Sequence, residues 1–260
     1  MSQAQKKIKP PSKLKYTIAF LILAALYVVS WRGVKGDIGE LIDGLPNIGD
    51  MMAQLWPPDF NYFIEILDPM LETIQMAILG TTFGALLSIP MILLASSNIF
   101  GRKVVLITRA ILNVTRTIPE LLFAGIFVAI VGLGPFAGIM ALTLFSFGII
   151  TKMTYESVET IDPGPLEAMT AVGANKLQYI GFAVVPQALP AFVAYVFYTF
   201  EVCVRASAIL GLVGAGGIGL VLNTALAMYQ YTHVASIILF TLIIVILIDT
   251  ISTRIREKLI

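Results

Sequence analysis

The sequence has 260 residues, of which 58% are apolar and only 13% are charged, and its mean hydropathy is +0.90. Soluble domains usually carry about a quarter charged residues, so the composition excludes an ordinary soluble globular protein and indicates that lipid solvates much of the surface. The net charge of +1 gives no reason to expect nucleic acid as a partner, and the single Cys203 and single His233 exclude an internal disulfide and favour no metal site.

The N-terminal segment places five lysines between residues 6 and 15 ahead of the apolar run Tyr16–Trp31. A secretory signal has the same layout, but the small-x-small cleavage pattern is missing and Trp31 and Arg32 stand in its place. The run is therefore predicted to be an uncleaved membrane helix, with a removed signal as the alternative. The acidic stretch Gly33–Leu71 is predicted to be an extracytoplasmic connection with one or two short surface helices.

A helix that crosses a membrane needs about 20 mostly apolar residues. Three further stretches meet this requirement: Thr73–Ala95, Ala188–Val204 with its continuation, and Val234–Ile251. Between the first two, a long apolar stretch starts near Pro119 and is divided into two spans by the turn Gly132–Pro135. This gives six spans. The segment Val104–Val114 either extends the short span that follows it or forms an amphipathic helix on the membrane surface.

The distribution of basic residues predicts the orientation of these six spans. With the N-terminus in the cytoplasm, 14 of the 17 basic residues fall on the cytoplasmic side. These are Lys6, Lys7, Lys9, Lys13, Lys15, Arg102, Lys103, Arg109, Arg116, Lys152, Lys176, Arg254, Arg256 and Lys258. The outside connection holds only Arg32 and Lys35 among many acids, so both termini are predicted to be cytoplasmic.

The connection between the fourth and fifth spans has the features of a small soluble helix-turn-helix. Asp162 suits an N-cap, and Glu167 lies early in the first helix, where a negative charge favours the helix dipole. Leu166, Met169 and Val172 form one apolar stripe on this helix, and Gly173 is expected to end it. A second short helix, NKLQYIGFAVV, is expected to close at Pro186. An ordinary amphipathic loop on the membrane surface is the alternative, whereas an exposed helix on rigid spans suits a partner's groove.

The spacing Glu167-Ala168-x4-Gly173-x12-Pro186 resembles the cytoplasmic coupling motif of permease subunits in ATP-binding-cassette importers. That motif reads Glu-Ala-Ala, three residues, Gly, nine residues, Ile-x-Leu-Pro. This sequence departs from it at Met169, Ala183 and Val185, each time without a change in polarity. The resemblance covers about Thr73 to Ile251 and includes the segment RTIPELL at 116–122.

This resemblance implies an all-α transmembrane fold of the type I importer (MetI-like) class in a bacterial inner or plasma membrane. The domains would be residues 1–32 with the first helix, 33–71 outside, and a permease core 72–260 with the coupling loop 160–187. The residues that would couple to the ATPase are Leu166, Glu167, Ala168, Met169, Val172, Gly173 and Pro186. The implied partners are an ATPase subunit dimer, an extracytoplasmic substrate-binding protein and a second copy of this chain. The sequence contains no Gly-Lys dipeptide and hence no P-loop, which agrees with an ATPase on a separate polypeptide.

A glycine-rich stretch follows the fifth span and formally satisfies G-x-G-x-x-G from Gly214 to Gly219. The dinucleotide-binding interpretation fails, because the required preceding strand and later acid are missing. Close helix packing is one alternative, and broken backbone beside a wet cavity is the other. Five glycines between Gly211 and Gly219 favour broken backbone.

Glu201 and Arg205 are four residues apart inside a span, so they share a helix face and can pair. Ionisable groups in a span usually face a bundle interior or an aqueous path. A structural salt bridge and a contact with substrate remain equally open. The residues predicted to line the path or gate are Glu201, Arg205, Ser207, Gly214, Gly216, Gly217 and Gly219.

The stretches Val131–Leu142 and Glu201–Gly219 look most like the phosphonate-transporter permease, with phosphite and phosphate-ester relatives close behind. The resemblance therefore implies import of phosphonate or a related oxyanion, with methionine or another small solute as the alternative. A guanidinium and backbone N–H groups would suit such an anion. An intramembrane enzyme would need a nucleophile and base, for which only Glu201 with Ser207 is available, and a secondary transporter would usually show inverted repeats. No catalytic, cofactor or metal residue is predicted.

Overall fold

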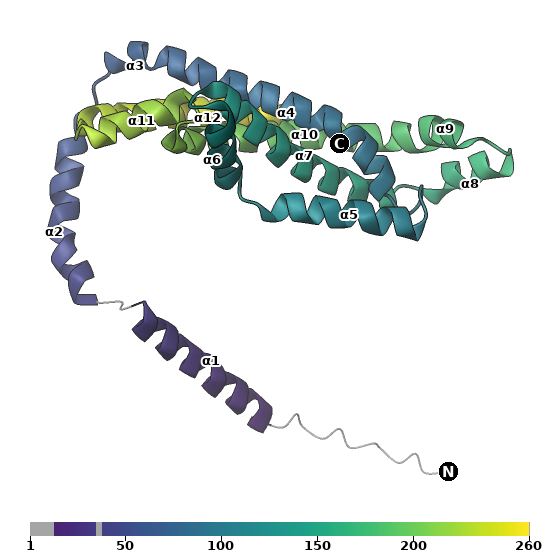
Figure 1. Cartoon of the computed structure of the whole chain (residues 1–260), viewed down its shortest axis with the longest axis horizontal. Coiled ribbons are helices and arrows are strands. Elements are labelled where there is room, and N and C mark those ends of the chain that lie inside the picture. The colour runs from purple at the N-terminus through teal and green to yellow at the C-terminus, as the bar shows by residue number, and fades with distance from the viewer. Residues whose placement is uncertain (1–12, 35–37, 260) are drawn as a thin grey trace. The chain divides into compact units, whose positions relative to one another are not determined.

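The computed structural model describes residues 13–34 and 38–259, and every regular element in these ranges is a helix (Figure 1). The predicted N-terminal tail, with Lys6, Lys7 and Lys9, lies outside the described residues, as do Lys35 and Asp37. The chain divides into two units, residues 1–53 and 54–260. The first unit contains α1 (Lys13–Gly33), an apolar helix without buried residues, and most of α2 (Ile38–Leu55).

The second unit contains the remaining helices, in an order that matches the predicted spans. They are α3 (Tyr62–Glu65), α4 (Leu67–Ala95), α5 (Arg102–Thr117), α6 (Glu120–Val131), α7 (Pro135–Glu159), α8 (Pro163–Ala171), α9 (Lys176–Tyr179), α10 (Val185–Leu210), α11 (Gly217–Ala227) and α12 (Tyr231–Arg256). A π-helical turn, Ile180–Val184, joins α9 to α10, and a 3-10 turn, Gly211–Val213, follows α10. In Figure 1, α4, α7, α10 and α12 run side by side, α6 crosses them, and α8 and α9 project from one end.

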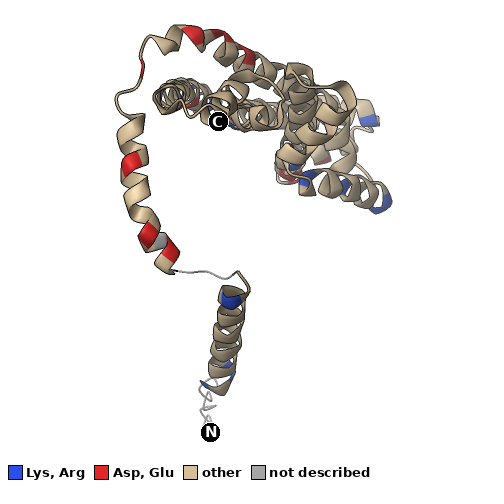
Figure 2. Cartoon of the chain, turned by 60° about the vertical axis from the view of Figure 1, so that its left-hand side comes forward, with Lys and Arg blue, Asp and Glu red and all other residues tan. Residues whose placement is uncertain are grey.

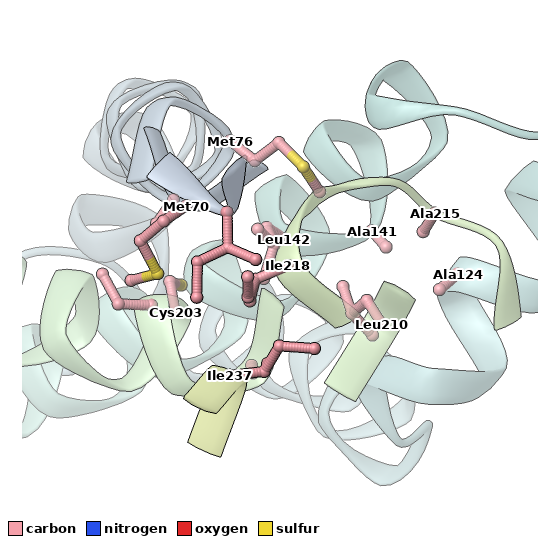
Figure 3. Packing of buried hydrophobic residues seen from close by; sticks show 14 of the residues in the cluster. Met70, Met76, Ala124, Ala141, Leu142, Cys203, Leu210, Ala215, Ile218 and Ile237 are labelled. Atoms are coloured by element: carbon pink, nitrogen blue, oxygen red, sulfur yellow. The ribbon is translucent and has the colours of Figure 1, made fainter. Parts of the chain in front are cut away.

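The core of this unit forms where α4 packs closely against α7. An added Cβ at Gly80 would lie 2.5 Å from the Cβ of Leu142, so the two backbones approach more closely than a larger residue allows. Leu142, Met76 and Ile218 are almost fully buried in the cluster that joins α4, α7, α10, α11 and α12 (Figure 3). Outside this cluster many large apolar side chains are exposed, as expected where lipid or other subunits cover the surface.

Five of the described helical stretches are long and apolar enough to cross a membrane, and six if a bent pair counts as one span. The bent pair is α5 with α6, whose axes turn by 83°. The helix α5 buries Val105, Thr108 and Leu112 against α4 and α7, and the sharp turn separates it from α6. Both alternatives for Val104–Val114, an extension of the short span and an amphipathic helix on the membrane surface, stay predictions. The predicted turn Gly132–Pro135 is present, with positive φ at Gly132 and Gly134.

Charged residues of the second unit separate toward its two ends. The acidic residues of α3 and the start of α4 lie at one end, and the basic residues of α5 lie toward the other (Figure 2). The end near α8 also carries Lys176, so the separation agrees with the basic side predicted from the sequence.

Candidate functional site: a projecting helical loop and an intramembrane charge cluster

The projecting loop begins with a capped helix. Asp162 is the N-cap of α8, and its carboxylate accepts a hydrogen bond from the Gly164 N–H at 2.9 Å, as the sequence predicts. The helix ends at Ala171, and Gly173 follows with a φ of +72°. The N–H of Ala174 donates to the Met169 carbonyl at 3.0 Å, which closes the helix end as a left-handed glycine permits.

The second helix of the loop is also fixed locally. Asn175 and Gln178 form a reciprocal capping box, with both hydrogen bonds at 2.9 Å. The Gln187 side chain of α10 bonds back to the backbone of Asp162, accepting from its N–H at 3.1 Å. The loop therefore has a defined shape before any partner binds.

Polar and aromatic contacts hold the loop on the ends of α4 and α7 and on α5. The Glu159 carboxylate accepts the Ser97 N–H at 2.7 Å and pairs with Arg109, which also donates to the Ala95 carbonyl. The Asn98 amide donates to the Val158 carbonyl at 2.8 Å. These bonds tie the ends of α4 and α7 to the middle of α5 beneath the loop.

Two contacts extend this support to α9. The ammonium of Lys176 lies 3.7 Å from the centroid of the Phe100 ring, and the Tyr179 hydroxyl donates to the Asn98 carbonyl at 3.5 Å. The sequence motif identifies none of the residues that support the loop, because each contact joins positions far apart in the chain.

The structure corrects two local expectations about the loop. Leu166 and Met169 are partly buried, but Val172 is 77% exposed, because it is the C-cap of α8 and has left the helical stripe. Pro186 does not close a second short helix; the helical run continues from Lys176 through the π-helical turn into α10. Pro186 lies in the first turn of α10, where a proline without an N–H is tolerated, and π-helical turns commonly take up such irregularity.

The exposed part of the loop offers a surface suited to a protein partner. Glu167 and Ala168 are exposed, and Leu177 and Phe182 are 81% and 72% exposed. A shallow cavity of about 520 Å³ lies between α8 and Tyr179 and includes Leu166 and Glu167 in its lining. Large exposed apolar side chains on a preformed scaffold favour docking into a groove.

The glycine-rich stretch breaks the helix that carries Glu201 and Arg205. After the 3-10 turn, Gly214, Gly216 and Gly217 all have positive φ, and α11 folds back against α10. An added Cβ at Gly219 would lie 1.9 Å from the Ala208 carbonyl oxygen. The stretch is therefore broken backbone, and Gly219 also permits close packing; the wet cavity expected beside the break stays a prediction.

The break is stabilised by α4 and is not open to an anion in this conformation. The Gly217 N–H donates to the Glu72 carboxylate at 3.3 Å, and the Ile218 N–H donates to the Thr73 hydroxyl at 2.8 Å. A carboxylate at the start of α11 also favours the helix dipole. The expectation that these N–H groups receive substrate is thus not supported, since α4 already binds two of them.

Ser207 likewise has a packing position. It is fully buried, and its hydroxyl donates to the Val204 carbonyl at 2.9 Å and to the Thr73 carbonyl at 3.4 Å. Its assignment to the translocation path stays a prediction.

Glu201 and Arg205 form the predicted pair, and α12 adds a third charge that sequence reasoning placed elsewhere. Oε1 of Glu201 accepts from Nη1 of Arg205 at 2.7 Å, and Oε2 accepts from Nη2 of Arg256 at 3.1 Å. The Glu201 side chain is only 7% exposed, against 47% for Arg205 and 26% for Arg256. One buried carboxylate therefore joins two guanidinium groups from α10 and α12, which leaves one surplus positive charge. This is named the Glu201 cluster.

Other chemistry is limited in the part of the chain that the structure describes. No group of three or more His, Cys, Asp or Glu side chains in residues 13–34 and 38–259 is arranged to hold a metal ion. Cys203 is buried in the core cluster of α10.

Comparison with known proteins places the chain among transport permeases. The family described as "binding-protein-dependent transport system inner membrane component" matches residues 80–260. The putative phosphite transport system permease protein HtxC of Stutzerimonas stutzeri is 35% identical over 91% of this chain and 84% of its own length. The phosphite transport system permease protein PtxC of the same species is 36% identical over 91% and 86%.

A solved structure agrees with this result. An inward-facing crystal form of the MetNI methionine ABC transporter contains a chain that superposes with a TM-score of 0.69 at 27% identity, covering 78% of this chain and 99% of the other.

Proposed function

Since the chain belongs to the family of binding-protein-dependent transport system inner membrane components, we propose that it is the permease subunit of an ATP-driven importer of phosphonate or a related oxyanion. Phosphite and phosphate esters are the related anions. The relatives named as phosphite permeases align over more than four-fifths of their own length, which supports the assignment. ATP hydrolysis would belong to a partner, and this chain would supply the path.

The preformed coupling loop carries this proposal. Its first helix has both ends fixed by Asp162 and Gly173, projects from the bundle, and keeps Glu167 exposed. A helix that is already ordered loses little conformational entropy when it docks. The loop would enter a groove on the ATPase, and closure of the ATPase pair would pull on it.

The assembly would contain two ATPase subunits, an extracytoplasmic binding protein and a second copy of this chain. We place both termini and α8 in the cytoplasm of a bacterial cell, because basic residues predominate in the N-terminal sequence and, separately, at the α8 end of the second unit. The binding protein would meet the acidic end, near α3 and the start of α4.

The Glu201 cluster favours an anion over methionine. Two guanidinium groups against one carboxylate leave a surplus positive charge beside a low-dielectric region. A zwitterionic substrate brings no net negative charge to balance that surplus, whereas a tetrahedral oxyanion does and also accepts two parallel hydrogen bonds from a guanidinium.

The coupling role is tested by Glu167→Lys in the complete importer, reconstituted in liposomes with its ATPase and binding protein. Reversal of this exposed charge is expected to reduce co-purification of the ATPase and to abolish ATP-driven phosphite uptake while membrane insertion continues. Glu40→Lys, the same change at an exposed position of α2, is the matched control. Normal uptake by the Glu167→Lys variant would contradict the coupling role. Uptake of methionine, but not of phosphite or phosphonate, by the wild type would contradict the substrate assignment.

A further inference from the structure

The Glu201 cluster has more positive charge than a structural salt bridge requires. Neutralising Glu201 takes one guanidinium, yet both carboxylate oxygens bind separate arginines from different helices. A surplus charge near membrane depth is costly unless water or an anion accompanies it. The two arginines are therefore suited to binding a second negatively charged group besides Glu201.

Arg256 is the member of the cluster that lines a cavity of the bundle, whereas the more exposed Arg205 does not line it. This cavity of about 610 Å³ lies between α7, α10 and the end of α12, and Arg256 lines it together with Tyr195, Tyr198 and Thr253. The Cζ atom of the Arg256 guanidinium lies 5.7 Å from the centroid of the Tyr198 ring, within the range of a cation–π contact. Nη2 donates to Glu201 and to the Thr253 hydroxyl at 3.0 Å.

One donor of the cluster has no protein partner in the described part of the chain. No hydrogen bond joins Nε of Arg256 to any other described residue, although the atom is buried. Tyr195 and Tyr198 also line the cavity, and Tyr198 is 36% exposed. The exposed Glu257 is the one carboxylate in the lining, and its charge opposes an anion there.

The position of the cavity along the bundle suits substrate leaving the membrane. Arg256 ends α12, 25 residues after Tyr231, which is about 38 Å at 1.5 Å per residue and exceeds the roughly 30 Å hydrocarbon core. The helix therefore reaches the membrane boundary on the side where α10 continues into the coupling loop. Arg205 lies one helical turn further along α10 from the coupling loop than Glu201. The Glu201 carboxylate therefore lies between the guanidinium of Arg205, farther from the loop, and that of Arg256.

We infer that Arg256, with the Tyr198 face and the neighbouring hydroxyls, forms an exit site for a tetrahedral oxyanion on the coupling-loop side of the membrane. Glu201 is a positioning residue: it holds Arg205 and Arg256 in place and does not contact substrate. The anion passes from Arg205 to Arg256 by exchanging hydrogen-bond donors, and no covalent bond changes. This inference depends on the proposed transport of oxyanions.

The test measures anion binding without transport. Phosphite is titrated into the nucleotide-free permease–ATPase complex in a phosphorus-free detergent, and broadening of its ³¹P resonance reports binding. The wild type is expected to broaden the resonance, and Arg256→Gln to weaken binding about tenfold to a hundredfold, as expected for charge-assisted hydrogen bonds. Arg254→Gln removes the same charge from an exposed position two residues away and is expected to bind as the wild type does.

A double variant separates a binding role from a structural one. If Arg256 only neutralised Glu201, Glu201→Gln with Arg256→Gln would restore wild-type broadening and uptake; the inference requires that binding stays weak while the complex remains assembled. Wild-type binding by either Arg256 variant overturns the exit site, as does absence of broadening in a wild type that transports phosphite. A wild type that fails to transport any phosphorus oxyanion contradicts the proposed function instead.

Discussion

Replacement of Gly173 tests whether the coupling loop must be preformed. Its φ is +72°, and no atom lies within 4 Å of an added Cβ, so Gly173→Ala has a backbone cost but no steric clash. A left-handed conformation costs an alanine about 1–2 kcal/mol. If the ATPase binds the loop only when residue 173 is in the left-handed conformation, this cost lowers the affinity of the permease for the ATPase. A cost of about 1–2 kcal/mol corresponds to about 5- to 30-fold weaker binding.

The assay is titration of the purified ATPase onto the reconstituted permease, together with ATP-driven uptake. Gly181→Ala is the matched control, because Gly181 lies in the same loop, has no positive φ and also has open space around its Cβ. Gly173→Asn is expected to fall between wild type and alanine, since asparagine tolerates this conformation better. Unchanged affinity of the Gly173→Ala variant for the ATPase would refute the argument that the partner recognises this helix end. Equal losses of affinity in Gly173→Ala and Gly181→Ala would mean that any substitution in the loop weakens binding.

Three other substitutions test the support of the loop and the glycine break. Glu159→Gln leaves Arg109 without its ionic partner and is expected to destabilise the permease by about 1–3 kcal/mol, which thermal unfolding in detergent measures; no change in the midpoint would contradict the ion pair's role. Gly219→Ala places a Cβ 1.9 Å from the α10 backbone, so overpacking of about 1–3 kcal/mol or more is expected to reduce the folded yield, while Gly125→Ala, with open space, should not. Thr73→Val removes the acceptor of the buried Ile218 N–H and is expected to cost about 1–3 kcal/mol, and a wild-type unfolding midpoint would show that the bond is dispensable.

The positions of most helices follow from the sequence because lipid imposes a simple requirement. About 20 apolar residues are needed per span, and the stretches that satisfy it correspond to α1, α4, α7, α10 and α12. The bent pair α5–α6 is harder to predict from the sequence. The helix α5 carries charged residues and buries only one face, and its axis turns by 83° from that of α6. Local patterns also predict the N-cap Asp162 and the terminating Gly173, because capping depends on neighbours in the chain.

The parts that sequence reasoning missed are contacts between distant residues. In the sequence, Arg256 is one of several basic residues at a helix end predicted to be cytoplasmic. Only the packing of α12 against α10 brings it to Glu201, 55 residues away. Glu72 reads as one of many outside acids, yet it binds the start of α11 across 145 residues of sequence. Such pairs carry no periodicity and no fixed spacing, so a single sequence contains no signal for them.

The continuity of α10 connects the two sites. From Lys176 the helical run passes through one π-helical turn and continues to Leu210, so α9 of the coupling loop and Glu201 lie on the same helical run. Glu201 is in turn bound to α12 through Arg256, and Ser252 of α12 donates to the Phe197 carbonyl at 3.2 Å. A movement of the loop therefore either takes α12 along with α10 or breaks the Glu201–Arg256 pair. In the second case Arg256 loses its carboxylate at the moment the loop moves, and its need for an anion is then greatest, which would couple the ATPase cycle to substrate passage through electrostatics alone.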